Sequence, residues 1–238
     1  MAYSLHSASR ACALAAICAA LLGWSPLPRL SAQARSPDST PKPRQIAPAM
    51  SWVYADWLTR QERQREEQPD RLVSSLNIPR GATVVDLGAG VGYFTWRLAR
   101  KVGRSGKVIA VDIQREMLDM LAVNLRERGI ENVEAVLATP QNPRLPQAVA
   151  DLVLLVDVYH ELAYPALTLA HIRRSLKPTG RLVVVEYRKG QPGVPIHPLH
   201  KMSVAEVRSE IEPAGFRFAE VLEFLPSQHV IIFTPASG

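Results

Sequence analysis

Three glycines close together are the first residues of this 238-residue chain that could do chemistry. Gly88, Gly90 and Gly92 follow a short apolar run and precede an amphipathic segment. A glycine-rich turn between a strand and a helix lets the backbone, and the N–H groups that start the helix, approach a ligand closely. Several nucleotide-like ligands fit such a turn, so the neighbouring residues must decide between them.

Two carboxylates and a tyrosine narrow the choice of ligand. A dinucleotide-binding turn would have a third glycine where this chain has Tyr93, and the carboxylate of Asp86 would be poorly placed beside a pyrophosphate. Such a carboxylate suits a ligand that carries an ammonium and a sulfonium. Asp112, twenty residues beyond Gly92, ends the next apolar run, where an acid can accept both ribose hydroxyls. Taken singly, Asp86 could cap a helix and Asp112 could begin a turn, but together their order and spacing indicate S-adenosylmethionine.

The elements that must position these residues follow a regular pattern. From Gly81 onward, short apolar runs alternate with amphipathic segments, which indicates parallel strands joined by crossover helices and hence an α/β fold. The expected strands, of which the last two form a hairpin, are Thr83–Leu87, Val108–Asp112, Val133–Leu137, Leu152–Val156, Arg181–Tyr187, Phe216–Phe224 and His229–Phe233. The expected helices are Tyr93–Lys101, Arg115–Arg128, Pro165–Leu176 and Val204–Ala214.

Four segments resemble the successive motifs of class I S-adenosylmethionine-dependent methyltransferases, in the expected order: Val84–Tyr93, Val108–Asp112, Asp151–Asp157 and Leu176–Arg181. The resemblance implies a Rossmann-like, seven-stranded, mostly parallel sheet of order 3-2-1-4-5-7-6, with strand seven antiparallel and helices on both faces. It also implies that S-adenosylmethionine, the cofactor, lies over the carboxyl ends of strands one, two and four.

The same resemblance implies which residues contact the cofactor. The methionine part would lie against the turn, the ribose against Asp112, one adenine face against Ile113, and the reactive methyl near Asp157. The loop after strand three lacks the acid that usually binds the adenine amino group, so Thr139 or the backbone must replace it. The full set of implied cofactor-binding residues is Asp86, Gly88, Ala89, Gly90, Gly92, Asp112, Ile113, Thr139 and Asp157.

The segment Val156–Glu161 would lie beside the transferring methyl. Methyl transfer is an in-line displacement at a cationic sulfur, so the enzyme mainly orients the acceptor and, for a hydroxyl or an activated carbon, removes its proton. We expect His160 to be the catalytic base, with Glu161 or Tyr159 orienting it. Alternatively, His160 only caps the helix that begins near Pro165 or packs against the next loop.

A second polar cluster, Pro195–Met202, follows strand five, where relatives of this fold build a substrate lid. Strand five itself ends in polar residues that would point toward the same mouth. We therefore expect Tyr187, His197 and His200 to bind the substrate. A purely structural loop is the alternative.

The histidines also raise the question of a metal. His197 and His200, together with His160 or His229, could supply imidazoles to a divalent cation. Their spacing is much weaker evidence than a zinc-finger pattern, and Pro198 disfavours a regular helix there. We therefore expect no metal.

These features favour a methyltransferase that acts on a small-molecule acceptor. Protein methylation, on a carboxyl or another side chain, and catalytically silent binding of S-adenosylmethionine are the alternatives. Nucleic acid is not expected as a partner, because an enzyme that methylates the adenine amino group would show Asp/Asn-Pro-Pro-Tyr/Phe where this chain has Asp157-Val158-Tyr159-His160. The formal charge of +6 is spread along the chain rather than gathered in one block. The sequence does not predict an oligomeric state.

The N-terminal residues do not resemble part of the domain. Arg10, an apolar run over residues 11–23 and Ala32-Gln33-Ala34 together predict a signal peptide, residues 1–34, and export to the periplasm. An uncleaved membrane anchor is the alternative, although the run is shorter than the roughly 20 residues of a membrane span; no stable span is expected after cleavage. Both cysteines lie in this segment, so the mature chain would have no thiolate nucleophile.

Three further regions are expected after the signal peptide. Residues 35–50 are rich in proline and are predicted to be a disordered linker. Residues 51–80 are predicted to form two capping helices that are separated at Pro69. Residues 81–238 are predicted to form the methyltransferase domain.

Overall fold

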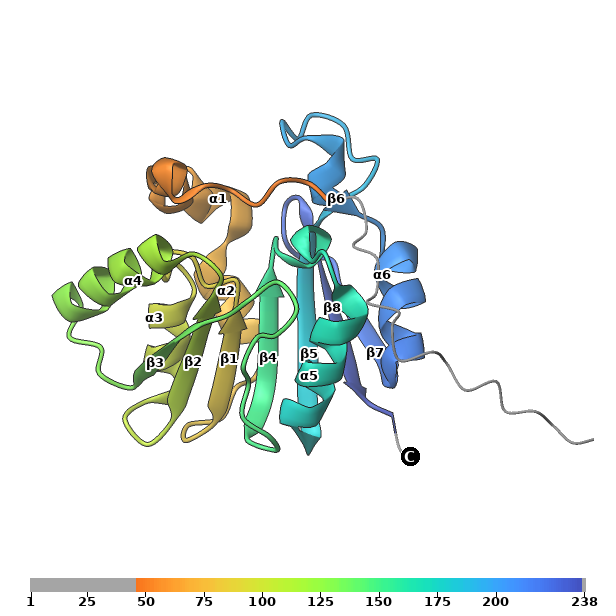
Figure 1. The fold of residues 1–238 in the computed structure, drawn as a ribbon. Helices are drawn as coiled ribbons and strands as arrows, with labels where there is room; N and C mark the ends of the chain where they lie inside the picture. The colour runs from red at the N-terminus through yellow and green to blue at the C-terminus, as the bar shows by residue number, and fades with distance from the viewer. Residues whose placement is uncertain (1–45, 237–238) are drawn as a thin grey trace, which may run out of the picture. The chain divides into compact units, whose positions relative to one another are not determined.

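The computed structural model describes residues 46–236; the expected signal peptide, and the expected linker up to residue 45, lie outside the described residues. The described chain forms a central sheet with the strand order β3-β2-β1-β4-β5-β8-β7 (Figure 1). Strand β8 runs antiparallel to both of its neighbours, whereas the strands from β3 to β5 are parallel. The predicted fold class and strand order are therefore confirmed, with β8 and β7 in the places of strands seven and six.

The structure fixes the bounds of each element. The strands are β1 Thr83–Leu87, β2 Lys107–Asp112, β3 Val133–Leu137, β4 Ala150–Val156, β5 Leu176–Arg188, β6 Lys201–Met202, β7 Phe216–Leu222 and β8 Gln228–Pro235. The α-helices are α1 Arg63–Glu67, α2 Pro69–Ser75, α3 Thr95–Val102, α4 Arg115–Glu127, α5 Pro165–Ser175 and α6 Val204–Ile211. The 3-10 helices are η1 Trp52–Thr59, η2 Tyr159–Glu161, η3 Pro198–His200 and η4 Glu212–Ala214. No helix of the described residues is long and apolar enough to cross a membrane.

The alternation of side chains along the strands places helices on both faces of the sheet. Val84 and Val108 belong to the cluster of buried residues that includes side chains of α2 and α3. Val85 and Ile109, one position further along the same strands, belong to the cluster that includes side chains of α5 and α6. Because both faces are covered, the central positions of the parallel strands are mostly apolar. The acids at the strand ends are therefore exceptions that need an explanation.

A short strand that we did not predict accompanies the end of β5. Tyr187 pairs with Lys201 and Arg188 pairs with Met202, so that β6 adds an eighth strand to the expected seven. Two residues are too few to show an alternating pattern, which is why this strand could not be predicted from the sequence. The pairing holds the loop after β5, with η3 and its histidines, against the carboxyl end of the sheet.

The region before β1 contains three short helices, η1, α1 and α2, where we expected two. The break between α1 and α2 lies at Gln68, whose φ is 45°, directly before Pro69. Proline disfavours the helical conformation in the residue that precedes it, which explains why the chain turns there. Residues 46–50, the described end of the expected linker, have neither helix nor strand, yet Ala47 is buried.

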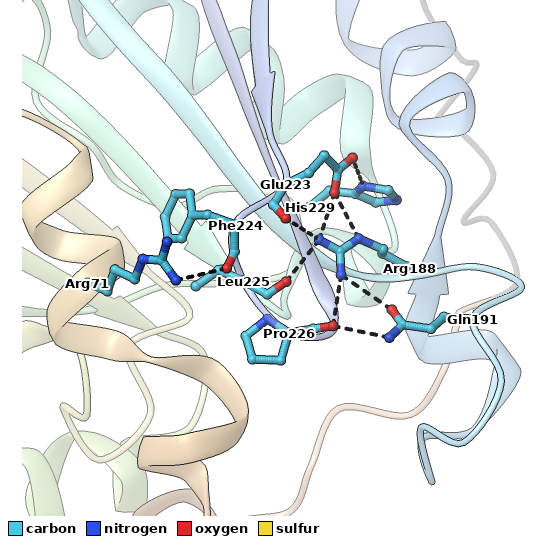
Figure 2. Close-up of polar contacts among 8 residues, drawn as sticks. All are labelled: Arg71, Arg188, Gln191, Glu223, Phe224, Leu225, Pro226 and His229. Carbon is cyan, nitrogen blue, oxygen red and sulfur yellow. Dashed lines mark hydrogen bonds and ion pairs between the residues drawn. The ribbon is translucent and has the colours of Figure 1, made fainter.

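Arg188, at the end of β5, anchors the loop between β7 and β8 (Figure 2). Its guanidinium donates to the Glu223 carboxylate at 2.8 Å and to the carbonyl oxygens of Leu225 and Pro226, both at 3.0 Å. A planar guanidinium presents five N–H donors in a fixed fork, so it can serve several acceptors of one loop at once. The anchored loop leads directly into Gln228, a residue of the candidate site.

We predict that Gly88→Ala destabilises the fold more than Gly190→Ala does. Both glycines have a φ near 80°, a conformation that costs a non-glycine residue about 1–3 kcal/mol. A Cβ at residue 88 would also lie 2.4 Å from a methyl group of Val158, whereas a Cβ at residue 190 would meet nothing within 4 Å. Overpacking costs about 1–3 kcal/mol, so urea unfolding should show that Gly88→Ala lowers the free energy of unfolding by that much more than Gly190→Ala does. Equal losses would contradict the close approach of Val158.

Candidate functional site

A cavity of about 250 Å³ opens at the carboxyl ends of β1, β2 and β4. Parallel α/β sheets bind their ligands at this edge, where the loops after the strands diverge. All but one of the expected cofactor-binding residues line the cavity: Asp86, Gly88, Ala89, Gly90, Asp112, Ile113, Thr139 and Asp157. The exception, Gly92, packs toward α4, where a Cβ would lie 3.2 Å from Leu121.

Asp112 joins the glycine turn to the end of β2. One carboxylate oxygen accepts the N–H of Gly90 at 2.8 Å, and the other accepts the N–H of Gln114 at 2.9 Å. Burial raises the pKa of Asp112, and these two hydrogen bonds lower it. The carboxylate is thus held in one orientation at the cavity wall, beside the half-exposed side chain of Ile113.

Asp86 lies deeper, below the same turn. It is buried, and the hydroxyl of Thr95 donates to its carboxylate at 2.6 Å. Burial raises the pKa of Asp86 to about 6; the charge of Asp112 adds to the increase, while the Thr95 hydrogen bond and the charge of Arg63 oppose it. A cation bound in the cavity would favour the ionised form, because an opposite charge stabilises a carboxylate.

The segment 46–50 forms part of the cavity wall. Ile46, Ala49 and Met50 line the cavity, and the side chain of Gln114 holds the segment at its end. The Gln114 amide donates to the carbonyl oxygen of Met50 at 2.8 Å and accepts the N–H of Trp52 at 3.0 Å. Gln114 also donates its own N–H to Asp112, so one residue connects the cavity wall to the acid at the end of β2.

A buried polar cluster lies between α1 and the ends of β4 and β8. Arg63 donates to Glu67 at 2.7 Å, and its guanidinium lies 4.2 Å from the centre of the Tyr93 ring. Asp157 accepts a hydrogen bond of 2.7 Å from Gln228. Burial, and next the charge of Glu67, raise the pKa of Asp157 well above its usual range. Arg63, Tyr93 and Asp157 are the members of this cluster that line the cavity.

Several buried oxygens of this cluster have no hydrogen-bond partner within the described part of the chain. They include one oxygen each of Glu67, Asp157 and Gln228, all of which are hydrogen-bond acceptors. Buried acceptors without a donor are costly, and a functional site is one place where they persist. Together with the cavity-lining carboxylates, they fit a ligand that brings N–H donors and positive charge.

His160 and Glu186 form a tightly held pair next to Glu161, which lines the cavity. The two residues face each other through His160 Nδ1 and a Glu186 carboxylate oxygen at 2.6 Å, and the other oxygen of Glu186 accepts the backbone N–H of His160 at 3.2 Å. The opposite ring nitrogen, Nε2, lies 2.9 Å from His200 Nδ1 and 3.9 Å from a carboxylate oxygen of Glu161. Burial raises the pKa of Glu161 to about 7, and the charge of His160 opposes that increase. Glu161 lines the cavity, whereas His160 does not.

The structure places three other expected residues away from the cavity. Tyr159 is buried in the core, and its hydroxyl donates to Glu210 of α6 at 2.9 Å. Tyr187 is buried, with its hydroxyl 3.4 Å from Glu67. His197 packs edge-on against the ring of His200. None of the three lines the cavity, so among the expected catalytic and substrate-binding residues only Glu161 reaches it.

The family profile described as a methyltransferase domain matches residues 78–215, more than half of the chain. The chain belongs to this family. The matched residues contain the glycine turn, the acids at the ends of β1, β2 and β4, and the His160–Glu186 pair.

Curated relatives match part of this methyltransferase. The ubiquinone/menaquinone biosynthesis C-methyltransferase UbiE of Escherichia fergusonii is 37% identical over 113 residues, which are 47% of this chain and 45% of the relative. UbiE of Salmonella arizonae is 38% identical over the same share of each chain. The chain thus spans about half the length of the curated relatives that it matches.

Solved structures share the fold over more of the methyltransferase. A SAM-dependent methyltransferase from Aquifex aeolicus is 26% identical, with a TM-score of 0.75 over 79% of this chain and 100% of that chain. The [4+2]-cyclase SpnF, at 17% identity, has a TM-score of 0.60 over 71% of this chain and 81% of its own, and shows the fold alone. The family, the relatives and the Aquifex aeolicus structure together support S-adenosylmethionine-dependent methyl transfer.

Sequence reasoning missed Arg63 and Gln114; it placed Glu186 among the polar residues that end strand five but did not pair it with His160. Glu186 interrupts the apolar run of β5 and is fully buried, so a charged residue inside a buried strand was the available signal. Arg63 and Glu67, four residues apart in a short helix, resembled an ordinary surface pair. Nothing in the sequence near Gln114 indicated that it holds a segment more than 60 residues away.

We predict a pH-dependent difference in stability between the wild-type methyltransferase and Asp86→Asn. The folded-state pKa of about 6 lies above the usual value of 3.8, so the native state binds this proton more tightly, and stability falls as the pH rises through 6. Between pH 5 and 7 the free energy of unfolding of the wild type should fall by about 1 kcal/mol more than that of the variant. Urea unfolding at several pH values measures this; a difference that stays constant with pH would contradict the raised pKa.

Proposed function

We propose that this methyltransferase transfers the methyl group of S-adenosylmethionine to a small-molecule acceptor that enters beside Glu161. The observation that supports the proposal most strongly is the convergence of three acids from three strand ends, Asp86, Asp112 and Asp157, on one cavity. Negative charge and unsatisfied acceptors at one wall suit a cationic donor molecule. The Glu161 carboxylate, which also lines the cavity, suits an acceptor that must lose a proton.

The donor would be held by the residues that line the cavity. Asp112, fixed by the N–H groups of Gly90 and Gln114, would accept the ribose hydroxyls. Ile113 would pack against the adenine. Asp86 and Asp157 would stabilise the positive charges of the amino acid part. The bound donor supplies a methyl group on a cationic sulfur, which leaves as a neutral thioether.

The rest of the cavity suggests the character of the acceptor. Besides Glu161, the lining residues next to it are apolar: Met50, Leu162 and Ala163. A small, mostly apolar molecule with one hydrogen-bond donor fits such a wall. The relatives named for C-methyl transfer in ubiquinone and menaquinone biosynthesis are compatible with an acceptor of this kind.

Acceptor activation would rely on Glu161, supported by His160. Glu161 is the polar group of this pair that lines the cavity, so it is the one placed to accept a hydrogen bond or a proton from the acceptor. His160, which Glu186 holds at 2.6 Å, would keep the Glu161 carboxylate in position. The structure thus favours exchanging the roles that we expected from the sequence, where His160 was the base and Glu161 oriented it.

We predict that Asp112→Asn weakens donor binding while Asp151→Asn does not. Asp112→Asn would lose the equivalent of one charge-assisted hydrogen bond to the ribose, which is worth about 1.5–3 kcal/mol, so the affinity for S-adenosylhomocysteine should fall about 10- to 100-fold. Asp151 is a matched control, because it also accepts a backbone N–H, from Thr83 at 2.9 Å, but it does not line the cavity. Isothermal titration calorimetry measures both affinities.

The same variants test methyl transfer. With donor carrying a tritiated methyl group, the wild type and Asp151→Asn should label the small-molecule fraction of a cell extract, and Asp112→Asn should not. Label in the protein fraction or in nucleic acid would contradict the acceptor class. Absence of donor binding in the wild type would contradict the proposal as a whole.

We also propose that the methyltransferase is exported to the periplasm. Support comes from the sequence of residues 1–34, with its apolar run over residues 11–23 and Ala32-Gln33-Ala34. Fractionation of cells that express the chain with a C-terminal epitope should place it in the periplasm, with its N-terminus at Arg35. Retention of residues 1–34, in the membrane or in the cytoplasm, would contradict this proposal.

A further inference from the structure

We propose that His160, Glu161 and His200 bind a divalent transition-metal ion, with Zn²⁺ the expected occupant. One ligand atom from each residue lies within 4.8 Å of the other two. The residues come from η2 and η3, which follow β4 and β5 and are brought together by the pairing of β6 with β5. This inference departs from our expectation, based on the sequence, that no metal binds.

The distances within the cluster are close to those of a ligand set. Two ligand atoms that each lie 2.0–2.1 Å from one ion are about 2.9–3.4 Å apart, depending on the coordination geometry. His160 Nε2 and His200 Nδ1 are already 2.9 Å apart. The Glu161 oxygen lies 3.9 Å from His160 Nε2, so a shift of about 1 Å would bring it to the same spacing.

Glu186 occupies the place of a supporting residue. In protein metal sites a ligating histidine commonly donates a hydrogen bond from the N–H of its second ring nitrogen to a carboxylate, which fixes the tautomer and the orientation of the ring. Glu186 is fully buried and lies 2.6 Å from His160 Nδ1. A carboxylate only accepts, so in the neutral ring Nδ1 carries the proton, and Nε2 directs its lone pair toward His200 and Glu161.

The donor atoms favour one class of cation. Two imidazoles and one carboxylate suit zinc and its first-row neighbours, whereas magnesium and calcium prefer oxygen ligands alone. Three protein ligands leave a coordination position open, as in catalytic zinc sites. Because Glu161 lines the cavity, that position would be accessible to an acceptor that carries a hydroxyl group. With the cation bound, Glu161 would act as its ligand rather than as the proton acceptor, and the cation would lower the pKa of the hydroxyl group so that its proton passes to solvent before methyl transfer.

The inference rests on the proposed function only for the use of the metal, not for its binding. Without a cation, the two imidazoles can share a hydrogen bond between His200 Nδ1 and His160 Nε2. That hydrogen bond explains the 2.9 Å distance between the two nitrogens, but Glu161 takes no part in it. The two accounts therefore differ in whether Glu161 and His200 both contribute to the affinity for a metal.

Zinc titration of the full-length chain separates these accounts. The purified chain, dialysed against a chelator, is titrated with zinc chloride by isothermal titration calorimetry at pH 7.5 in the absence of donor. We expect one high-affinity Zn²⁺ per chain. His200→Ala and Glu161→Gln should each weaken this binding at least 10-fold. His171→Ala, a matched histidine on α5 that pairs with Arg174, should leave it unchanged.

Donor binding in the same preparations reports on folding. A variant that loses zinc but still binds S-adenosylhomocysteine is folded at this edge of the sheet, so its loss supports the metal site. No zinc uptake by the wild type, or undiminished uptake by His200→Ala and Glu161→Gln, would overturn the inference. If the wild type binds S-adenosylhomocysteine but not zinc, the metal-site inference is contradicted and the proposed function is not. If it binds zinc but not S-adenosylhomocysteine, the proposed methyl transfer is contradicted and the metal site is not.

Discussion

The candidate site depends most on the carboxylate of Asp112. Its two oxygens accept the N–H groups of Gly90 and Gln114, and so join the turn after β1 to the end of β2. Gln114 then holds the chain at Met50 and Trp52 with its side-chain amide. One buried acid therefore sets the shape of the glycine turn and of the cavity wall formed by residues 46–50.

The electrostatics of the cavity are set by its buried carboxylates, which outnumber the basic side chains beside them. Burial raises the pKa of Asp86, Asp112, Asp157 and Glu161, and one arginine, Arg63, faces the first and third of these from α1. An enclosed surface with more acids than bases disfavours its own ionised state and gains from a bound cation. The fold tolerates this cost where a positively charged donor, and in our proposal a metal ion, would offset it.

The sequence was sufficient to predict the fold and most of the acids and glycines that line the cavity, because both depend on local patterns. Alternating apolar runs fix a parallel sheet, and a parallel sheet brings every strand end to one edge, so Asp86 and Asp112 had to meet. The parts that were missed depend on contacts between distant segments. Glu186 meets His160 across 26 residues, β6 exists only by pairing with β5, and residues 46–50 gain their place from Gln114. Composition alone made that last segment resemble a linker.

Hydrogen–deuterium exchange with and without S-adenosylhomocysteine tests the central claim most directly, because it reports on each segment separately. If the turn held by Asp112 forms the donor site, the ligand should protect residues 46–59, 86–93 and 112–114, and should leave β7, residues 216–222, unchanged. Binding that leaves residues 86–93 and 112–114 unprotected would contradict the account.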